Sequence, residues 1–153
     1  MLGFSNAAFK DSGFRRHVIG PVGANLGLGV LARHVVSLLL SQGCPVRILD
    51  IDPKLGRGGH DQRFAEHTVA SVAELTYPVT FLVSTPISIA EFFRDRRNRG
   101  LLSRSDGLNA ALLYWEQMVV PDEWARFLAG LNVIEAPSTF TRETFEEALP
   151  GVL

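Results

Sequence analysis

The chain has 153 residues, of which 46% are hydrophobic and 20% charged, and its formal net charge is −1. This length fits one domain with a full hydrophobic core, and the near-neutral charge argues against a nucleic-acid partner. The single cysteine, Cys44, excludes an intrachain disulfide, and the sequence has neither a run of about 18 apolar residues nor a signal-peptide pattern.

These features indicate a reducing, cytoplasmic location, with peripheral attachment to the inner face of the membrane left open. We expect Cys44 to be a buried, structural thiol, because it stands in a helix-to-strand turn without cysteines at metal-ligand spacing. No metal site is expected from the histidines, which also lack zinc-ligand spacing: His17, His34, His60 and His67.

The first elements are an arm, a strand and a helix. Residues 1–16 lack clear periodicity and predict an N-terminal arm ahead of a domain over residues 17–153. A short strand at about 17–20 runs into a glycine-rich turn, and a helix follows at about 27–42. Apolar residues lie on most faces of this helix, so we expect it to be largely buried. Its narrow polar stripe consists of Arg33, His34, Ser37 and Ser41.

The rest of the chain alternates between strand and helix patterns. Strands are expected at about 46–51, 79–83, 110–115 and 132–136, and helices at about 87–98, 121–131 and 140–149. Between the second and third strands we expect a flexible loop at 53–59, while the pattern of residues 60–77 is ambiguous and allows a short helix at about 62–74. The alternation predicts an α/β fold, a Rossmann-like three-layer sandwich whose mostly parallel sheet has five or more strands and helices on both faces.

Polar residues follow several of the expected strands. They are Asp50, Asp52, Ser84, Glu116 and Ser138, and the glycine-rich turn follows the first strand. We expect these residues to share one rim, because the carboxyl ends of parallel strands meet at one edge of a sheet and ligands bind there. Ser138, or its neighbour, can also cap the last helix, with Glu143 placed to complete a capping box.

The segment Gly27-Leu-Gly29-Val-Leu-Ala32 matches the dinucleotide pattern G-x-G-x-x-A, with Asp50 and Asp52 about 20 residues further on. The match is imperfect, because Gly27 lies well past the end of the first strand rather than directly after it. Three interpretations stay open: a nicotinamide or flavin site, a loop that holds the phosphate of another ligand, and a purely structural turn.

Other groups also have both a functional and a structural interpretation. His60 and Asp61 can act as an acid–base pair, or the histidine can make an ordinary loop hydrogen bond. Glu116 can orient sugar hydroxyls or act as a base, or it can be a salt-bridged surface residue. A basic cluster consists of Arg94, Arg96, Arg97, Arg99 and Arg104. It can bind an acidic acceptor or an anionic lipid, or it can be a solvated helix end.

Three segments resemble a known family. They are Asn25-Leu-Gly-Leu-Gly-Val-Leu-Ala-Arg33, Tyr114-Trp-Glu116 with Pro121-Asp-Glu-Trp124, and Glu135-Ala-Pro-Ser-Thr-Phe140. Their order and spacing over residues 17–150 are similar to the N-terminal half of retaining GT-B fold glycosyltransferases, of the group 1 or family 4-like class. The resemblance implies a Rossmann-like domain that mainly binds the sugar acceptor, while a second half of the enzyme binds the nucleotide-sugar.

The resemblance also implies substrate contacts for particular residues. The glycines of the loop would approach the phosphates or the sugar of the donor, and the flanking Asn25 and Arg33 would touch donor or acceptor. Glu116 matches a carboxylate that faces the cleft between the halves, and Ser138 matches the serine that starts the last helix. The candidate site is thus Asn25, Gly27, Gly29, Arg33, Glu116 and Ser138, with no catalytic residue assigned and no cofactor implied.

The chain departs from this family in its length, since it stops at about the point where the family continues into its donor domain. The expectation is a fragment that is inactive alone. Its partners in the whole enzyme would be a nucleotide-sugar and a saccharide or lipid-linked acceptor. Its exposed cleft face is expected to be partly apolar and to self-associate. The alternative is a stand-alone nucleotide- or dinucleotide-binding α/β module.

Overall fold

The computed structural model describes residues 15–51, 60–104 and 106–150. The loop expected at 53–59 and the neighbouring Asp52 lie outside these ranges, as does most of the arm expected at 1–16. Arg16, at the end of that expected arm, is already part of the first strand, where it pairs with strand residues on both sides.

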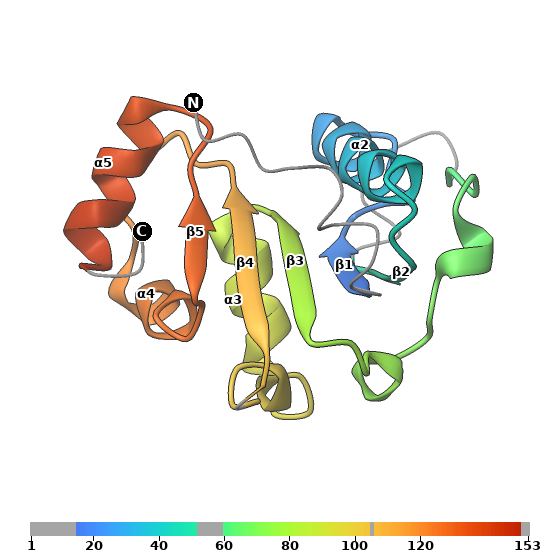
Figure 1. Ribbon diagram of the computed structural model, residues 1–153. Helices are drawn as coiled ribbons and strands as arrows, with labels where there is room; N and C mark the ends of the chain where they lie inside the picture. The colour runs from blue at the N-terminus through green and yellow to red at the C-terminus, as the bar shows by residue number, and fades with distance from the viewer. Residues whose placement is uncertain (1–14, 52–59, 105, 151–153) are drawn as a thin grey trace.

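Five strands form one parallel sheet in the order β2-β1-β3-β4-β5 (Figure 1). They are β1 (Arg16–Gly20), β2 (Val46–Asp50), β3 (Val79–Ser84), β4 (Leu108–Leu113) and β5 (Val133–Glu135). Each strand lies close to its expected place, and β4 starts and ends somewhat earlier than expected. The predicted α/β, Rossmann-like architecture is therefore confirmed.

The described residues form four α-helices: α2 (Gly27–Ser41), α3 (Pro86–Arg94), α4 (Asp122–Leu128) and α5 (Thr139–Ala148). Thr85 is the N-cap of helix α3, and its hydroxyl accepts the backbone N–H of Ser88. Ser138 is the N-cap of helix α5, and its hydroxyl accepts the N–H of Thr141. Glu143 therefore lies too far along α5 to close the predicted capping box. None of the described helices is long and apolar enough to cross a bilayer.

The segment between β2 and β3 corrects one expectation, because no α-helix forms at 62–74. The chain makes two short 3₁₀ turns instead, Ala65–His67 and Val72–Glu74. Between them, the backbone N–H of Val69 donates to the carbonyl oxygen of Ile48 at 2.8 Å, at the edge of the sheet. Pairing with the sheet thus takes the place of the helical hydrogen bonds that local propensity favoured.

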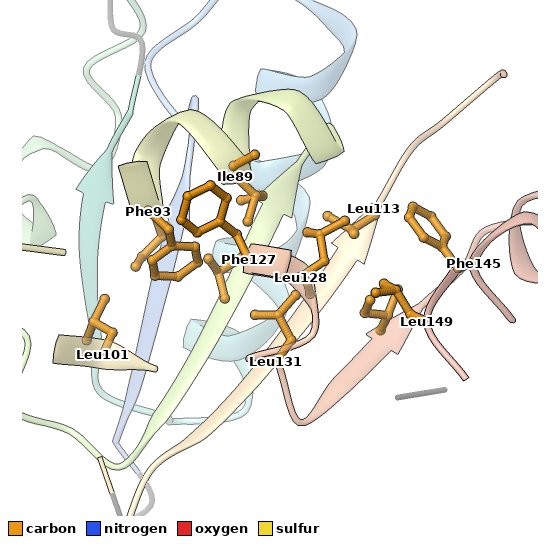
Figure 2. Packing of buried hydrophobic residues seen from close by; sticks show 14 of the residues in the cluster. Ile89, Phe93, Leu101, Leu113, Phe127, Leu128, Leu131, Phe145 and Leu149 are labelled. Atoms are coloured by element: carbon orange, nitrogen blue, oxygen red, sulfur yellow. The ribbon is translucent and has the colours of Figure 1, made fainter. Parts of the chain in front are cut away.

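Side chains that alternate along the strands form two apolar clusters, one on each face of the sheet. On one face, Val18, Ile48 and Val83 pack with Ala32 and Val36 of α2. On the other face, the strands pack against α3, α4 and α5 (Figure 2), and this larger cluster includes Ile19, Leu82, Leu113, Phe93, Leu128 and Phe145. The helices predicted on both faces are therefore present.

Helix α2 is buried on one side only, which corrects the expectation of a largely buried helix. Its buried residues are Gly29, Ala32, Arg33 and Val36, whereas Leu38 is 63% exposed. Arg33 therefore belongs to the buried side and not to the expected polar stripe. Cys44, which follows the helix, is buried as expected.

Candidate functional site

The carboxyl ends of the strands meet at one edge of the sheet, toward which the arrows of β4 and β5 point in Figure 1. The glycine-rich turn follows β1, Asp50 ends β2, and Ser84 ends β3. Glu116 and Ser138 follow β4 and β5. The described members of the expected rim thus share this edge, although Ser84 is buried.

An open cavity of about 540 Å³, the first cavity, lies at this edge between the start of α2 and the end of β4. It is lined by Gly27, Leu28, Leu31, Thr85, Tyr114, Trp115, Glu116 and Gln117. Gly27 and Glu116, two residues that the sequence assigned to one site, therefore line one cavity. Its volume lies within the usual range of small-ligand sites, roughly 300–1,000 Å³.

A second cavity, of about 480 Å³, lies against the start of α5. It is lined by Tyr114, Trp115, Glu116, Pro137, Ser138, Phe140 and Thr141. Glu116 and Ser138 thus line the same cavity. The hydroxyl of Ser138 caps α5, 3.1 Å from the backbone nitrogen of Thr141, so its first role is to fix one wall of the second cavity.

Trp115 fixes the wall that the two cavities share. Its indole N–H donates to the carbonyl oxygen of Val119 at 3.1 Å, and its ring packs edge-on against Trp124 with centroids 5.3 Å apart. The hydroxyl of Thr141 donates to the carbonyl oxygen of Trp115 at 3.3 Å, which ties the start of α5 to the same segment. The Trp-Glu and Pro-Asp-Glu-Trp motifs seen in the sequence therefore pack together behind this wall.

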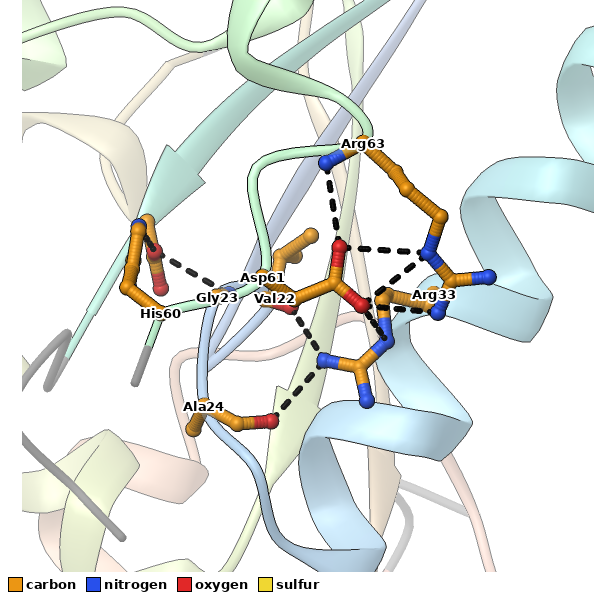
Figure 3. A network of polar contacts seen from close by, with 8 residues as sticks. Val22, Gly23, Ala24, Arg33, His60, Asp61 and Arg63 are labelled. Carbon is orange, nitrogen blue, oxygen red and sulfur yellow. Dashed lines mark hydrogen bonds and ion pairs between the residues drawn. The ribbon is translucent and has the colours of Figure 1, made fainter. Parts of the chain in front are cut away.

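Arg33 holds the glycine-rich turn from within (Figure 3). One guanidinium nitrogen donates to the carbonyl oxygens of Val22 and Ala24, at 2.7 and 2.8 Å. The Nε atom lies 3.3 Å from a carboxylate oxygen of Asp61. Arg33 is buried and lines neither cavity. The contact of Arg33 with donor or acceptor stays a prediction, and the contacts that the structure gives are with the backbone of the turn and with Asp61.

The dinucleotide interpretation of the glycine pattern fits this geometry poorly. The second glycine of such a loop leaves room for a pyrophosphate. At Gly29, however, that room is taken by protein, since an added Cβ would lie 2.0 Å from the carbonyl oxygen of Ala24. Asp50, in the place of the ribose-binding acid, accepts the N–H of Gly23 at 3.1 Å. Of the two glycines in the pattern, Gly27 is the one that faces open space, with nothing within 4 Å of an added Cβ.

His60 pairs with Asp50 rather than with its neighbour in the sequence, Asp61. The Nε2 atom of His60 lies 3.5 Å from a carboxylate oxygen of Asp50. Asp61 instead contacts Arg63 and Arg33, and its hydrogen bonds from Arg63 lower the pKa of Asp61 to about 2. The acid–base pair considered for His60 and Asp61 does not form, because Asp61 is bound as a carboxylate to two arginines.

Arginines of the basic cluster make ion pairs and hydrogen bonds within the protein. Arg94 pairs with Glu91, and Arg97 pairs with Asp95. Arg99 donates to the carbonyl oxygen of Phe93 at 2.8 Å, in the last turn of α3. These contacts fit the structural interpretation, in which cations satisfy the negative end of a helix.

Sequence reasoning missed several lining residues, and three of the six residues of its candidate site line neither cavity: Asn25, Gly29 and Arg33. Tyr114 and Phe140 are 39% and 45% exposed at the two cavities, although large aromatic side chains are usually more buried. The sequence could have indicated both residues, since both lie in segments that follow a strand. Leu31 and Thr85 had no distinctive signal. Asn25 is exposed but lies outside both linings.

The fold and this edge define the class of the protein: an α/β domain with a Rossmann-like parallel sheet and ligand-sized cavities at its carboxyl edge. Comparison of the chain with protein-family models, with curated proteins and with solved structures found no match. Within residues 15–51, 60–104 and 106–150, no group of three or more His, Cys, Asp or Glu side chains could hold a metal ion. The functional interpretation therefore depends on the geometry of the cavities.

Proposed function

We propose that the chain is the acceptor-side, N-terminal domain of a retaining GT-B fold glycosyltransferase. The observation that carries the proposal is the first cavity, in which the start of α2 and the carboxylate of Glu116 face one space at the carboxyl edge of the sheet. In that enzyme a sugar would pass from a nucleotide-sugar to a saccharide or lipid-linked acceptor, and the chain alone would bind acceptor without transferring sugar.

The lining of the first cavity suits a saccharide. Sugars combine hydroxyl groups with apolar C–H faces, and the cavity offers both kinds of partner. Glu116 and Gln117 supply polar groups, while Tyr114 and Leu31 supply apolar surface. The backbone N–H groups at the start of α2 also favour negative charge, so they would stabilise the leaving diphosphate held by a second domain.

The same edge carries exposed apolar residues that a second domain would cover. Met118 and Val119, directly after the shared wall, are 77% and 71% exposed. We therefore expect the chain by itself to associate weakly with further copies through this edge. Light scattering at rising concentration should show an increasing apparent mass, and Met118→Ser with Val119→Ser should reduce that increase. A constant monomer mass would contradict the expectation.

Glu116→Gln tests the acceptor site directly. The substitution keeps the shape of the side chain but removes the charge that strengthens hydrogen bonds from sugar hydroxyls. It should weaken saccharide binding by roughly tenfold. The two tryptophans of the sequence, Trp115 and Trp124, both lie at this wall, so intrinsic fluorescence reports on it. Calorimetry provides the independent reading.

The titration uses methyl glycosides and short oligosaccharides of glucose, galactose and mannose, with NAD(H) and nucleotide-sugars as further ligands. Glu147→Gln is the matched control, because Glu147 is exposed on α5 and lines neither cavity. Binding that falls in Glu116→Gln but not in the control supports the proposal. Tight NAD(H) binding without saccharide binding would support the stand-alone dinucleotide module instead.

A further inference from the structure

The two cavities at the carboxyl edge are neighbours with a common wall. Tyr114, Trp115 and Glu116 line both of them. The first cavity extends from this wall to α2, and the second extends to the first turn of α5. A ligand that crosses the wall can therefore occupy both spaces.

Contacts of Trp115 with neighbouring segments support the common wall. The carbonyl oxygen of Trp115 accepts a hydrogen bond from the hydroxyl of Thr141 in α5, and its indole N–H donates a hydrogen bond to the carbonyl oxygen of Val119. The edge-on contact with Trp124 fixes the ring further. A ligand with two binding units at matching spacing would gain from this arrangement without reorganising the protein.

Each space has an exposed aromatic ring and a volume large enough for a small ligand. Phe140, 45% exposed, lines only the second cavity, and Tyr114, 39% exposed, stands at the common wall. Each exposed ring offers a flat apolar surface that a ligand in the cavity can contact. The flat, partly apolar faces of sugar rings fit such surfaces.

The charge of Glu116 limits which chemical groups of a ligand can lie at the wall between the two cavities. Its carboxylate is exposed and lines both cavities. A phosphodiester or diphosphate at the crossing would place like charges together, which is unfavourable. If the crossing is a neutral glycosidic bond, the hydroxyl groups next to it can instead donate hydrogen bonds to the carboxylate.

We propose that the acceptor is an oligosaccharide of at least two sugar units, which lies across the Tyr114–Glu116 wall with one unit in each cavity. This inference rests on the proposed function and goes further, because it defines the length of the acceptor and the neutral linkage at its crossing point. Phe140 contacts the unit in the second cavity and determines the preference for the longer acceptor.

The test compares affinities along a series of one to four units in gluco-, galacto- and manno-oligosaccharides, measured by calorimetry and tryptophan fluorescence. In at least one series, affinity should rise about tenfold from one unit to two and change little beyond three. Phe140→Ala should remove this rise while leaving the affinity for the single unit unchanged. Leu38→Ala is the control, because Leu38 is 63% exposed on α2 and lines neither cavity.

The possible outcomes separate this inference from the proposed function. Equal affinity for one and two units would overturn the two-unit acceptor while leaving saccharide binding intact. Equal losses for one and two units in Phe140→Ala would also overturn it, because Phe140 would then act on the whole site. Absence of binding by every saccharide would overturn both proposals.

Discussion

Gly29→Ala is expected to destabilise the fold by roughly 3 kcal/mol, whereas Gly27→Ala should leave its stability unchanged or raise it by up to about 1 kcal/mol. The new Cβ at position 29 would lie 2.0 Å from the carbonyl oxygen of Ala24 and 2.9 Å from that of Pro21. Both are backbone atoms of the turn that Arg33 holds, so they cannot move aside without breaking its hydrogen bonds.

Gly27 is a matched control within the same helix. It is the first residue of α2, it is exposed, and an added Cβ would meet nothing within 4 Å. Alanine also has the higher helix propensity, because glycine loses more conformational entropy when it becomes helical. The two substitutions therefore add the same methyl group to one helix, into filled space at Gly29 and into open space at Gly27.

Urea denaturation followed by circular dichroism measures both effects. If Gly29→Ala does not fold at all, that result agrees with the expected loss of stability. A Gly29→Ala protein within about 0.5 kcal/mol of the parent would show that α2 does not pack on the turn as described. A large loss in Gly27→Ala would show that this position is also filled, and the first cavity would then be smaller than 540 Å³.

His17 should make the folded state sensitive to acid between about pH 6.5 and pH 4. Its ring is fully buried in β1 and stacks on Tyr77 with centroids 4.8 Å apart. The backbone N–H of Tyr77 donates to Nε2 at 2.9 Å, and Nδ1 lies 3.4 Å from the hydroxyl of Thr80. Nε2 is thus an acceptor and Nδ1 carries the proton, which is the neutral form of the ring.

Burial, together with the positive charges of Arg104 and Arg47, lowers the pKa of His17 from 6.5 to about 4. Because the folded-state pKa lies below the unfolded one, the unfolded chain binds the extra proton first as the pH falls. This contribution to stability is complete above pH 6.5 and is lost as the pH approaches 4. The pKa difference corresponds to about 3 kcal/mol at most.

His17→Gln tests this expectation, because its side-chain oxygen can accept the N–H of Tyr77 but does not titrate. Urea denaturation at several pH values should show a flatter pH dependence between 6.5 and 4 than in the parent. His34→Gln, at an exposed position on α2, is the control and should keep the parental slope. If His17→Gln does not fold, NMR of the parent decides: ring signals of His17 that titrate near pH 6.5 would contradict the prediction.

Asp61 should add a separate loss of stability in stronger acid. Its hydrogen bonds with Arg63 hold its pKa near 2, below the ordinary value of 3.8. A carboxyl group with a depressed pKa stabilises the fold above its unfolded-state pKa and loses this effect as the pH falls toward the folded-state value. The Asp61 contribution therefore disappears between about pH 4 and pH 2, below the window of His17.

Local patterns in the sequence determined the order of the elements. Alternating strands and helices, the proline before α4, and the serine before α5 act over a few residues, so they can be interpreted without a structure. The same patterns predicted that the turn after β1 and the segment after β4 lie at one edge of the sheet, because the carboxyl ends of parallel strands share an edge. Gly27 and Glu116 were therefore found from the sequence.

Only the tertiary structure decided which atoms fill the space around each residue. Arg33 belongs to a helix with few polar residues, yet its guanidinium is buried against two carbonyl oxygens of the turn. Gly29 completes a ligand-binding pattern, yet its space is taken by the backbone. His60 pairs with Asp50, a residue from a different element. These outcomes depend on contacts between segments far apart in the sequence, and a local pattern carries no information about the distance between such segments.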